Sequence, residues 1–143
     1  MPDEAPYRNI NFRVDIAGLS ELAFREVVLP ETRIELVEYR VGTDSVARTR
    51  KLPGRAITGN VVLKRGIDHD LSIWAWFKSV RDGSLDRRDG SIILLDSEGK
   101  EVRRWNLSRA WPVAYEPSAL HALKTEVAIE TLELSCEAID IEV

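Results

Sequence analysis

Three short segments carry residue types that could support chemistry, and each lacks a feature that its chemistry requires. Gly54–Gly59 has the glycine spacing of a phosphate-binding loop, but Asn60 stands where a lysine must reach the terminal phosphates. Asp68–Asp70 could suggest a metal site, yet adjacent residues of an extended chain point to opposite sides. Cys136 has no histidine in its own segment to activate it as a nucleophile. We therefore expect a loop entering a strand, a polar turn and a buried thiol, and we assign no catalytic, cofactor-binding or metal-binding residue.

Four tryptophans, Trp74, Trp76, Trp105 and Trp111, could offer a stacking platform for bases or sugars. Trp74 lies on the apolar face of a predicted helix, and Trp105 alternates with other apolar residues, so core packing is favoured for both. Trp76 points elsewhere on that helix and is a candidate for an interface.

The net charge of −4 conceals two segments of opposite sign. From Ser45 to Ile67 there are six bases and no acid, and from Thr125 to Val143 there are six acids and no base. Such runs are either solvated or part of an interface, and opposite patches on one chain suit head-to-tail self-association. The candidate interface residues are Arg48, Arg50, Lys51, Arg55, Lys64, Arg65, Glu126, Glu130, Glu133 and Glu137.

Length and composition predict one folded domain. The 143 residues are 44% apolar and 31% charged, an ordinary balance for a globular protein. No apolar run is long enough to cross a bilayer, the N-terminus is acidic rather than apolar, and a single cysteine excludes an internal disulfide. We expect synthesis and folding in a reducing cytoplasm, with a flexible tail over residues 1–10 and the domain over 11–143.

Period-two alternation predicts several strands around one helix. Residues 11–17, 21–29, 32–41 and 60–64 are predicted strands, and 91–96 with 101–107 forms a predicted hairpin. Apolar residues change face within 32–41, which indicates a bulge or a strand covered on both sides. Residues 42–56 are predicted to form a long basic loop around Pro53 and Gly54. Asp70 is the expected N-cap of a helix over residues 71–81.

The C-terminal segment fits either a bulged strand region or a helix, with the pattern favouring the strands. Strands on both sides of one helix predict a mainly β fold: two packed antiparallel sheets forming a barrel or sandwich, with the helix on its flank. The expected core residues include Phe12, Val14, Trp74, Phe77, Trp105, Ile129 and Leu132.

Several short sequence segments, taken in their order and spacing, resemble those of one protein family. They are Asn11–Ile16, Val37–Arg40, Arg50–Gly54, Gly59–Gly66, a Trp-containing helix, Arg87–Ile92, Trp105–Leu107, Ala110–Pro112 and Glu126–Glu133. Together they resemble the tail tube family of contractile phages and extracellular contractile injection systems, over nearly the whole chain.

The resemblance implies six-fold rings whose inner sheets join around a lumen and which stack head to tail into a tube. It implies a surrounding contractile sheath, baseplate or spike and terminator proteins as partners, and a cargo effector or DNA in the lumen. The segment Gly42–Gly54 corresponds to the family's extended loop, which contacts neighbouring subunits and rings. It also implies strands for the C-terminal segment and a structural, non-enzymatic role.

Two other functions remain open at this stage. A tube-initiating baseplate paralogue shares the fold and differs in copy number. A small β-barrel module that binds nucleic acid or a ligand through Trp76 and the basic segment predicts a monomer with salt-dependent binding.

Overall fold

The structure is a computed structural model that describes residues 11–40, 42 and 49–142. The expected tail over residues 1–10 and the candidate Arg48 lie outside these ranges. The elements in chain order are β1 (Asn11–Ile16), β2 (Glu26–Val28), β3 (Thr32–Arg40), β4 (Thr49–Thr58), β5 (Val61–Gly66), α1 (Ser72–Arg81), β6 (Arg88–Leu95), β7 (Glu101–Pro117), β8 (Ile129–Ser135) and β9 (Ala138–Ile141).

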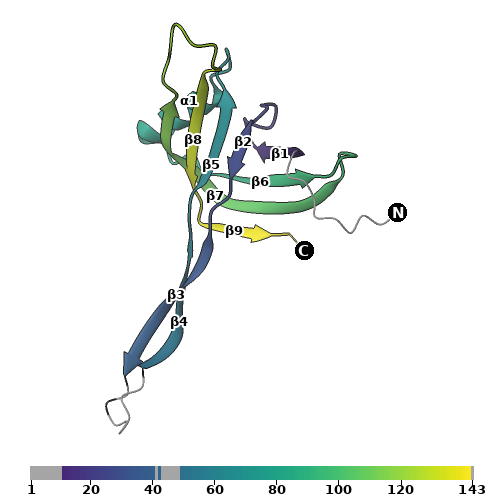
Figure 1. Cartoon of the computed structure of the whole chain (residues 1–143). Helices are drawn as coiled ribbons and strands as arrows, with labels where there is room; N and C mark the ends of the chain where they lie inside the picture. The colour runs from purple at the N-terminus through teal and green to yellow at the C-terminus, as the bar shows by residue number, and fades with distance from the viewer. Residues whose placement is uncertain (1–10, 41, 43–48, 143) are drawn as a thin grey trace.

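The long strand β7 belongs to two antiparallel sheets (Figure 1). Its first half pairs with β6 and β9, and β6 pairs with β1, which gives a first sheet in the order β9-β7-β6-β1. Its second half pairs with β8, which continues through β5 to β2 as the second sheet. The strand changes direction at Arg109, which has a φ of 51°. The two sheets confirm the predicted class, but the barrel does not close: among the described residues β1 and β2 are its unjoined ends.

The core lies between the inner faces of the two sheets and α1. Val14, Ile92 and Leu107 come from the first sheet, and Leu63 and Leu132 from the second. Of the expected core residues, Val14 and Leu132 are fully buried. The other five are partly buried: Phe12, Trp74, Phe77, Trp105 and Ile129.

The helix begins at Ser72, one residue later than expected, and its N-cap position is Leu71. Asp70 still accepts a hydrogen bond from the Ser72 backbone N–H at 2.8 Å, so it satisfies a free donor of the first turn. The tryptophan assignment needs correction, because Trp76 is the buried one, at 1% exposure. Its indole N–H donates to the Asp86 carbonyl at 2.8 Å, whereas Trp74 is only partly buried and packs beside Phe77 and Tyr115.

The prediction of a loop over residues 42–56 is wrong for Thr49 onwards, because β4 starts there and pairs with β3. A bulge accommodates the Pro53-Gly54 pair: Gly54 and Arg55 together lie opposite Glu35. A Cβ on Gly54 would lie 2.9 Å from the Glu35 carbonyl oxygen, so the close approach requires glycine. The extra residue belongs to β4, so it is not the bulge that the change of face within residues 32–41 led us to expect.

The C-terminal segment forms strands, as its pattern favoured. β8 and β9 are separated by a short break at Cys136–Glu137, where the chain passes from the second sheet to the first. The Glu137 N–H donates to the Ser108 carbonyl at this crossing. The break explains why the apolar residues occupy even positions in β8 (Leu132 and Leu134) and odd positions in β9 (Ile139 and Ile141).

Candidate assembly interface

The β3–β4 hairpin, here called the arm, extends away from the body (Figure 1). Every residue of β3 is exposed, and in β4 only Thr58, at the base, is not. Large apolar side chains nevertheless occupy both faces. Ile34 and Leu36 lie on one face, and Val37, Tyr39 and Leu52 lie on the other. An isolated two-stranded ribbon with apolar residues on both faces is a surface that a second molecule can cover.

The basic candidates on the arm stay at the surface. Arg50 lies opposite Tyr39, and Lys51 lies opposite Glu38. Arg55 donates to Glu35 across the bulge at 3.2 Å, and both side chains are largely exposed.

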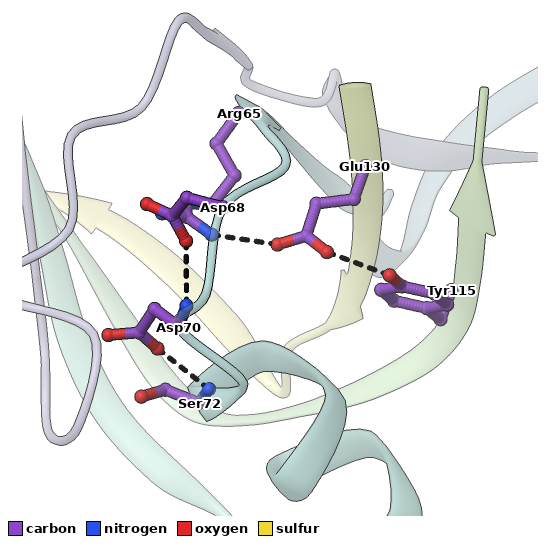
Figure 2. Close-up of polar contacts among 6 residues, drawn as sticks. All are labelled: Arg65, Asp68, Asp70, Ser72, Tyr115 and Glu130. Carbon is purple, nitrogen blue, oxygen red and sulfur yellow. Dashed lines mark hydrogen bonds and ion pairs between the residues drawn. The ribbon is translucent and has the colours of Figure 1, made fainter. Parts of the chain in front are cut away.

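In contrast, the body brings one basic and one acidic candidate together in its interior (Figure 2). Arg65 at the end of β5 lies opposite Glu130 at the start of β8, and its Nη1 donates to the Glu130 carboxylate at 2.9 Å. The two side chains are 4% and 7% exposed. This contact lies within one subunit, so neither charge is available for a contact between subunits, although the buried Arg65 Nε has no hydrogen-bond partner among the described residues.

Two neighbours complete this polar network. Arg65 Nη2 donates to Asp68 at 2.6 Å, and the Tyr115 hydroxyl donates to the second Glu130 oxygen at 2.7 Å. Asp68 also accepts from the Asp70 backbone N–H, so Asp68–Asp70 forms the polar turn expected from the sequence. The network ties β5, β7 and β8 to the turn that leads into α1.

The network shifts the titration of its members. Burial works against the charged form of Arg65, but hydrogen bonds to Asp68 and Glu130 outweigh it and raise the Arg65 pKa. Burial, reinforced by the hydrogen bond to Glu130, raises the pKa of Tyr115 to about 12. The hydrogen bond from Arg65 lowers the pKa of Asp68. All three shifts favour the protonation states that the hydrogen bonds need at neutral pH.

The remaining candidates are distributed over the body surface. Lys64 pairs with Glu26 across β2 and β5 at 3.5 Å, and Glu133 accepts from Asn60 at 2.7 Å. Glu137 accepts from both Arg87 and Arg109. Glu126 lies in the exposed β7–β8 connection, which extends from the body at the end opposite to the arm (Figure 1).

The first sheet has two edges without a partner strand among the described residues, β1 and β9. Arg13 on β1 and Asp140 on β9 are exposed, and within the part of the chain that the structure describes neither side chain has a bonding partner. Sequence reasoning missed both residues because it looked for runs of charge. The alternation Phe12-Arg13-Val14 was the available signal, since it places an isolated charge on the free face of an edge strand.

Cys136 is half-buried, and burial raises the pKa of its thiol to about 11. This disfavours the thiolate that a nucleophile needs. In the described ranges no three metal-ligating side chains come together, and no helix is both long and apolar enough to span a bilayer.

The chain thus combines two bent antiparallel sheets, a flanking helix and a protruding hairpin, and comparison with known families shows which class of protein has this fold. A model described as "T4-like virus tail tube protein gp19" matches residues 8–140, so the chain belongs to this family of structural tube proteins. The search of curated proteins finds no match.

Solved structures support the same fold. A chain of the anti-feeding prophage baseplate superposes with a TM-score of 0.85 at 26% identity, covering 98% of this chain and 97% of that one. A chain of the PVC extracellular contractile injection system, from its extended sheath-tube complex, gives 0.85 at 23% identity, with 97% and 93% covered. Hcp1 of Flavobacterium johnsoniae is more distant, at 0.54 and 15% identity, with 91% and 93% covered.

Proposed function

We propose that this chain is the repeated subunit of the inner tube of a phage tail or contractile injection particle. Six copies form a ring, rings stack head to tail, and a contracting sheath drives the hollow tube through a target envelope. The family match over residues 8–140 supports this, as do the neighbours in a sheath-tube complex and a six-fold symmetrised baseplate.

The arm carries this proposal. Its apolar side chains gain no protection from the subunit's own body, and Leu36 is 58% and Ile34 65% exposed. A neighbouring copy that covers the arm removes these side chains from water, which stabilises the assembly rather than the monomer.

The arm and the β7–β8 connection extend from opposite ends of the body, and this suits head-to-tail stacking (Figure 1). The arm contributes Arg50 and Lys51, while the connection contributes Glu126 together with Lys124 and His121. A contact between unlike ends is heterologous, and such contacts close into rings or continue as filaments. Arg50 and Lys51 remain our interface candidates on the arm, together with Arg48, which precedes β4 in the sequence.

In this role the protein works mechanically, with no catalysis and no cofactor. It is made and assembled in the bacterial cytoplasm, with sheath, baseplate or spike and terminator proteins as partners. A cargo effector or DNA passes through the lumen. The domain spans residues 11–143, with a tail over 1–10.

A tube-initiating baseplate paralogue is the second candidate, because one of the similar structures is a baseplate. The two roles differ in copy number. A tube subunit repeats along the whole shaft of the particle, whereas an initiator forms one or two rings at its base.

Electron microscopy and native mass spectrometry of the purified protein test the proposal. We expect hexameric rings or tubes, alone or on co-expression with a sheath. The triple variant Arg48→Glu, Arg50→Glu, Lys51→Glu should impair ring formation or stacking while the circular dichroism spectrum stays native. A protein that stays monomeric at every concentration and salt, and binds oligonucleotides in a salt-dependent way, would instead be a binding module.

A further inference from the structure

We propose that a cluster of charged residues at the bend of β7 sets the angle between the two sheets, and thereby the direction in which the arm leaves the subunit. We call this cluster the corner; it consists of Arg87 and Asp89 at the start of β6, Arg109 on β7 and Glu137 between β8 and β9. This inference rests on the proposed ring, because a ring closes only when every subunit presents its contacts at the same angle.

The strand β7 bends where it passes from one sheet to the other. Its pairing with β6 ends at Ala110, and its pairing with β8 begins at Trp111. Just before this point, Ser108 and Arg109 together lie opposite Asp89, so β7 carries one extra residue. Such a bulge bends and twists a strand locally, and here it directs β7 into the second sheet.

The extra residue has an unfavourable backbone conformation. Among the described residues, Arg109 is the only non-glycine residue with a positive φ, at 51°. Glycine is the usual residue in this left-handed region, because it has no Cβ to collide with the backbone. Other residues stay there only where their surroundings hold them. The contacts of Arg109 therefore show what determines the bend.

These contacts come from both sheets. Asp89 accepts a hydrogen bond from the Arg109 backbone N–H at 2.8 Å, which holds the bend to β6. Arg109 Nε donates to the Glu137 carboxylate at 2.9 Å, and Arg87 donates to the same oxygen at 3.1 Å. The Glu137 backbone N–H donates to the Ser108 carbonyl at 2.9 Å. The corner thus joins two places where the chain changes sheet, the bend of β7 and the break between β8 and β9.

A neighbouring residue, Arg88, attaches the corner to the core. Its Nη1 donates to the Ala17 carbonyl at 2.6 Å, and its guanidinium lies 4.5 Å from the centre of the buried Trp76 ring. Asp86 pairs with the same guanidinium at 2.8 Å. Since Asp89 follows Arg88 directly, its carboxylate holds Arg109 from a fixed position.

The ion pairs of the corner act on orientation more than on stability. The side chains of Arg109 and Glu137 are both more than half exposed, so their ion pair adds little to the free energy of unfolding. It nevertheless connects two chain segments at the point where the hydrogen-bond ladder of β7 changes partners. Loss of this connection should leave the fold intact and widen the range of angles between the sheets.

The arm is sensitive to this angle because it continues the second sheet (Figure 1). β2 and β5 pair with each other, and β3 and β4 follow β2 and precede β5 in the chain. The Gly59 N–H donates to the Glu31 carbonyl at 3.2 Å at the base of the arm. A strand of ten residues such as β4 spans about 30 Å, so a small rotation at the bend displaces its far end by several ångströms. A fixed corner therefore presents the arm to a neighbouring copy at one angle.

A distance measurement within one subunit tests the corner directly. Spin labels at Glu38→Cys on the arm and Arg103→Cys on the first sheet, in a Cys136→Ser background, report this distance by double electron–electron resonance. Labelled chains are diluted into unlabelled chains of the same variant, so that only pairs within one chain contribute. Arg109→Gly should broaden the distance distribution, because glycine keeps the bend but makes no contact with Glu137.

Assembly gives the second measurement. Arg109→Gly should raise the protein concentration needed for rings at least about tenfold, or produce rings of several sizes in native mass spectra, because the arm is no longer preorganised. Asp89→Ala should act in the same way. The matched control Asp89→Asn keeps an acceptor for the Arg109 N–H and should behave as the native chain. Circular dichroism should be native for all three variants.

The two measurements together decide the proposal. Broadened distances combined with weakened or mixed rings support it. Normal rings from Arg109→Gly and Asp89→Ala overturn it while the tube function stands. Weakened rings with an unchanged distance distribution also overturn it, since the corner would then be a direct contact between subunits. Equal effects of Asp89→Ala and Asp89→Asn overturn the role of the hydrogen bond. A native chain that stays monomeric overturns the tube function, and the distance distributions of the monomers still show whether the corner holds the sheets.

Discussion

Two pairs of strands in this protein have the same antiparallel backbone pairing. They differ in whether another layer of the subunit packs against them. β5 and β8 alternate buried and half-buried residues, with Leu63 and Leu132 fully buried beneath an opposing layer. β3 and β4 are longer, yet almost every residue is exposed. Both pairs contain β-branched and charged residues, so pairing alone does not determine burial. The second layer is present inside the subunit for β5–β8, and for the arm we propose that another copy supplies it.

Opposite charges have correspondingly different roles in the two regions. The Arg65–Glu130 pair is buried, so each charge depends on the other for its solvation. The Arg55–Glu35 pair lies in water, where an ion pair contributes about 0–1 kcal/mol. We expect substitutions in the body to change the free energy of unfolding, and substitutions in the arm to change assembly.

The largest effect should come from Arg65→Met. It leaves Glu130 charged and buried without its cation, and breaking a buried pair in this way costs about 3–5 kcal/mol. Urea unfolding followed by tryptophan fluorescence measures the loss. The double variant Arg65→Met, Glu130→Leu should recover most of it, because no buried charge is then left alone. A single variant as stable as the native chain would contradict the buried network.

A smaller effect is expected from Tyr115→Phe, which removes the hydrogen bond to Glu130 at a cost of about 1.5–3 kcal/mol. Because folding raises the pKa of Tyr115 to about 12, its contribution is fully present below about pH 10 and is lost as the pH rises toward the folded value. The difference in unfolding free energy between native and variant should therefore shrink from pH 9 to pH 11. A difference that does not change over this range would show that the hydroxyl is not coupled to Glu130.

The smallest effect on stability should come from the arm variant Ile34→Ser, Leu36→Ser. Exposed positions usually change the unfolding free energy by no more than about 0.5 kcal/mol each. Rings or tubes should nevertheless be lost in electron micrographs. Leu85→Ser, at an 83% exposed leucine outside the arm, is the matched control and should assemble. Normal assembly of the arm variant would contradict the role of the arm.

Sequence patterns predicted the strands best where one face is buried. The alternation Phe12-Arg13-Val14 located β1. The face change within residues 32–41 was read as a bulge, but in β3 it reflects apolar side chains on both exposed faces, and the bulge lies in β4. The strand β4 was missed because Pro53 and Gly54 normally indicate a loop. Here Pro53 and Gly54 are tolerated because β4 is an edge strand and has a bulge at this point. The sequence does not reveal the edge or the bulge unless the partner strand is known.

Charge runs predicted less about the contacts. They assigned Arg65 and Glu130 to an interface, whereas the register of β5 and β8 places them opposite each other inside the subunit. Register depends on tertiary pairing, so a count of charges along the chain cannot distinguish an internal pair from an external one. Trp76 shows the same limitation, since the helix pattern does not reveal that the Asp86 carbonyl accepts its N–H and so satisfies the buried indole.

The sharing of β7 between both sheets has a mechanical consequence. Its 17 residues form one covalent strand that is hydrogen-bonded to β6 and β9 along its first half and to β8 along its second. A compressive load on one sheet therefore passes to the other through peptide bonds as well as through side-chain packing. The two sheets can slide apart only if one half of β7 separates from its neighbouring strands, which breaks many hydrogen bonds at once. A subunit built in this way resists shear as a single body when its neighbours push against it.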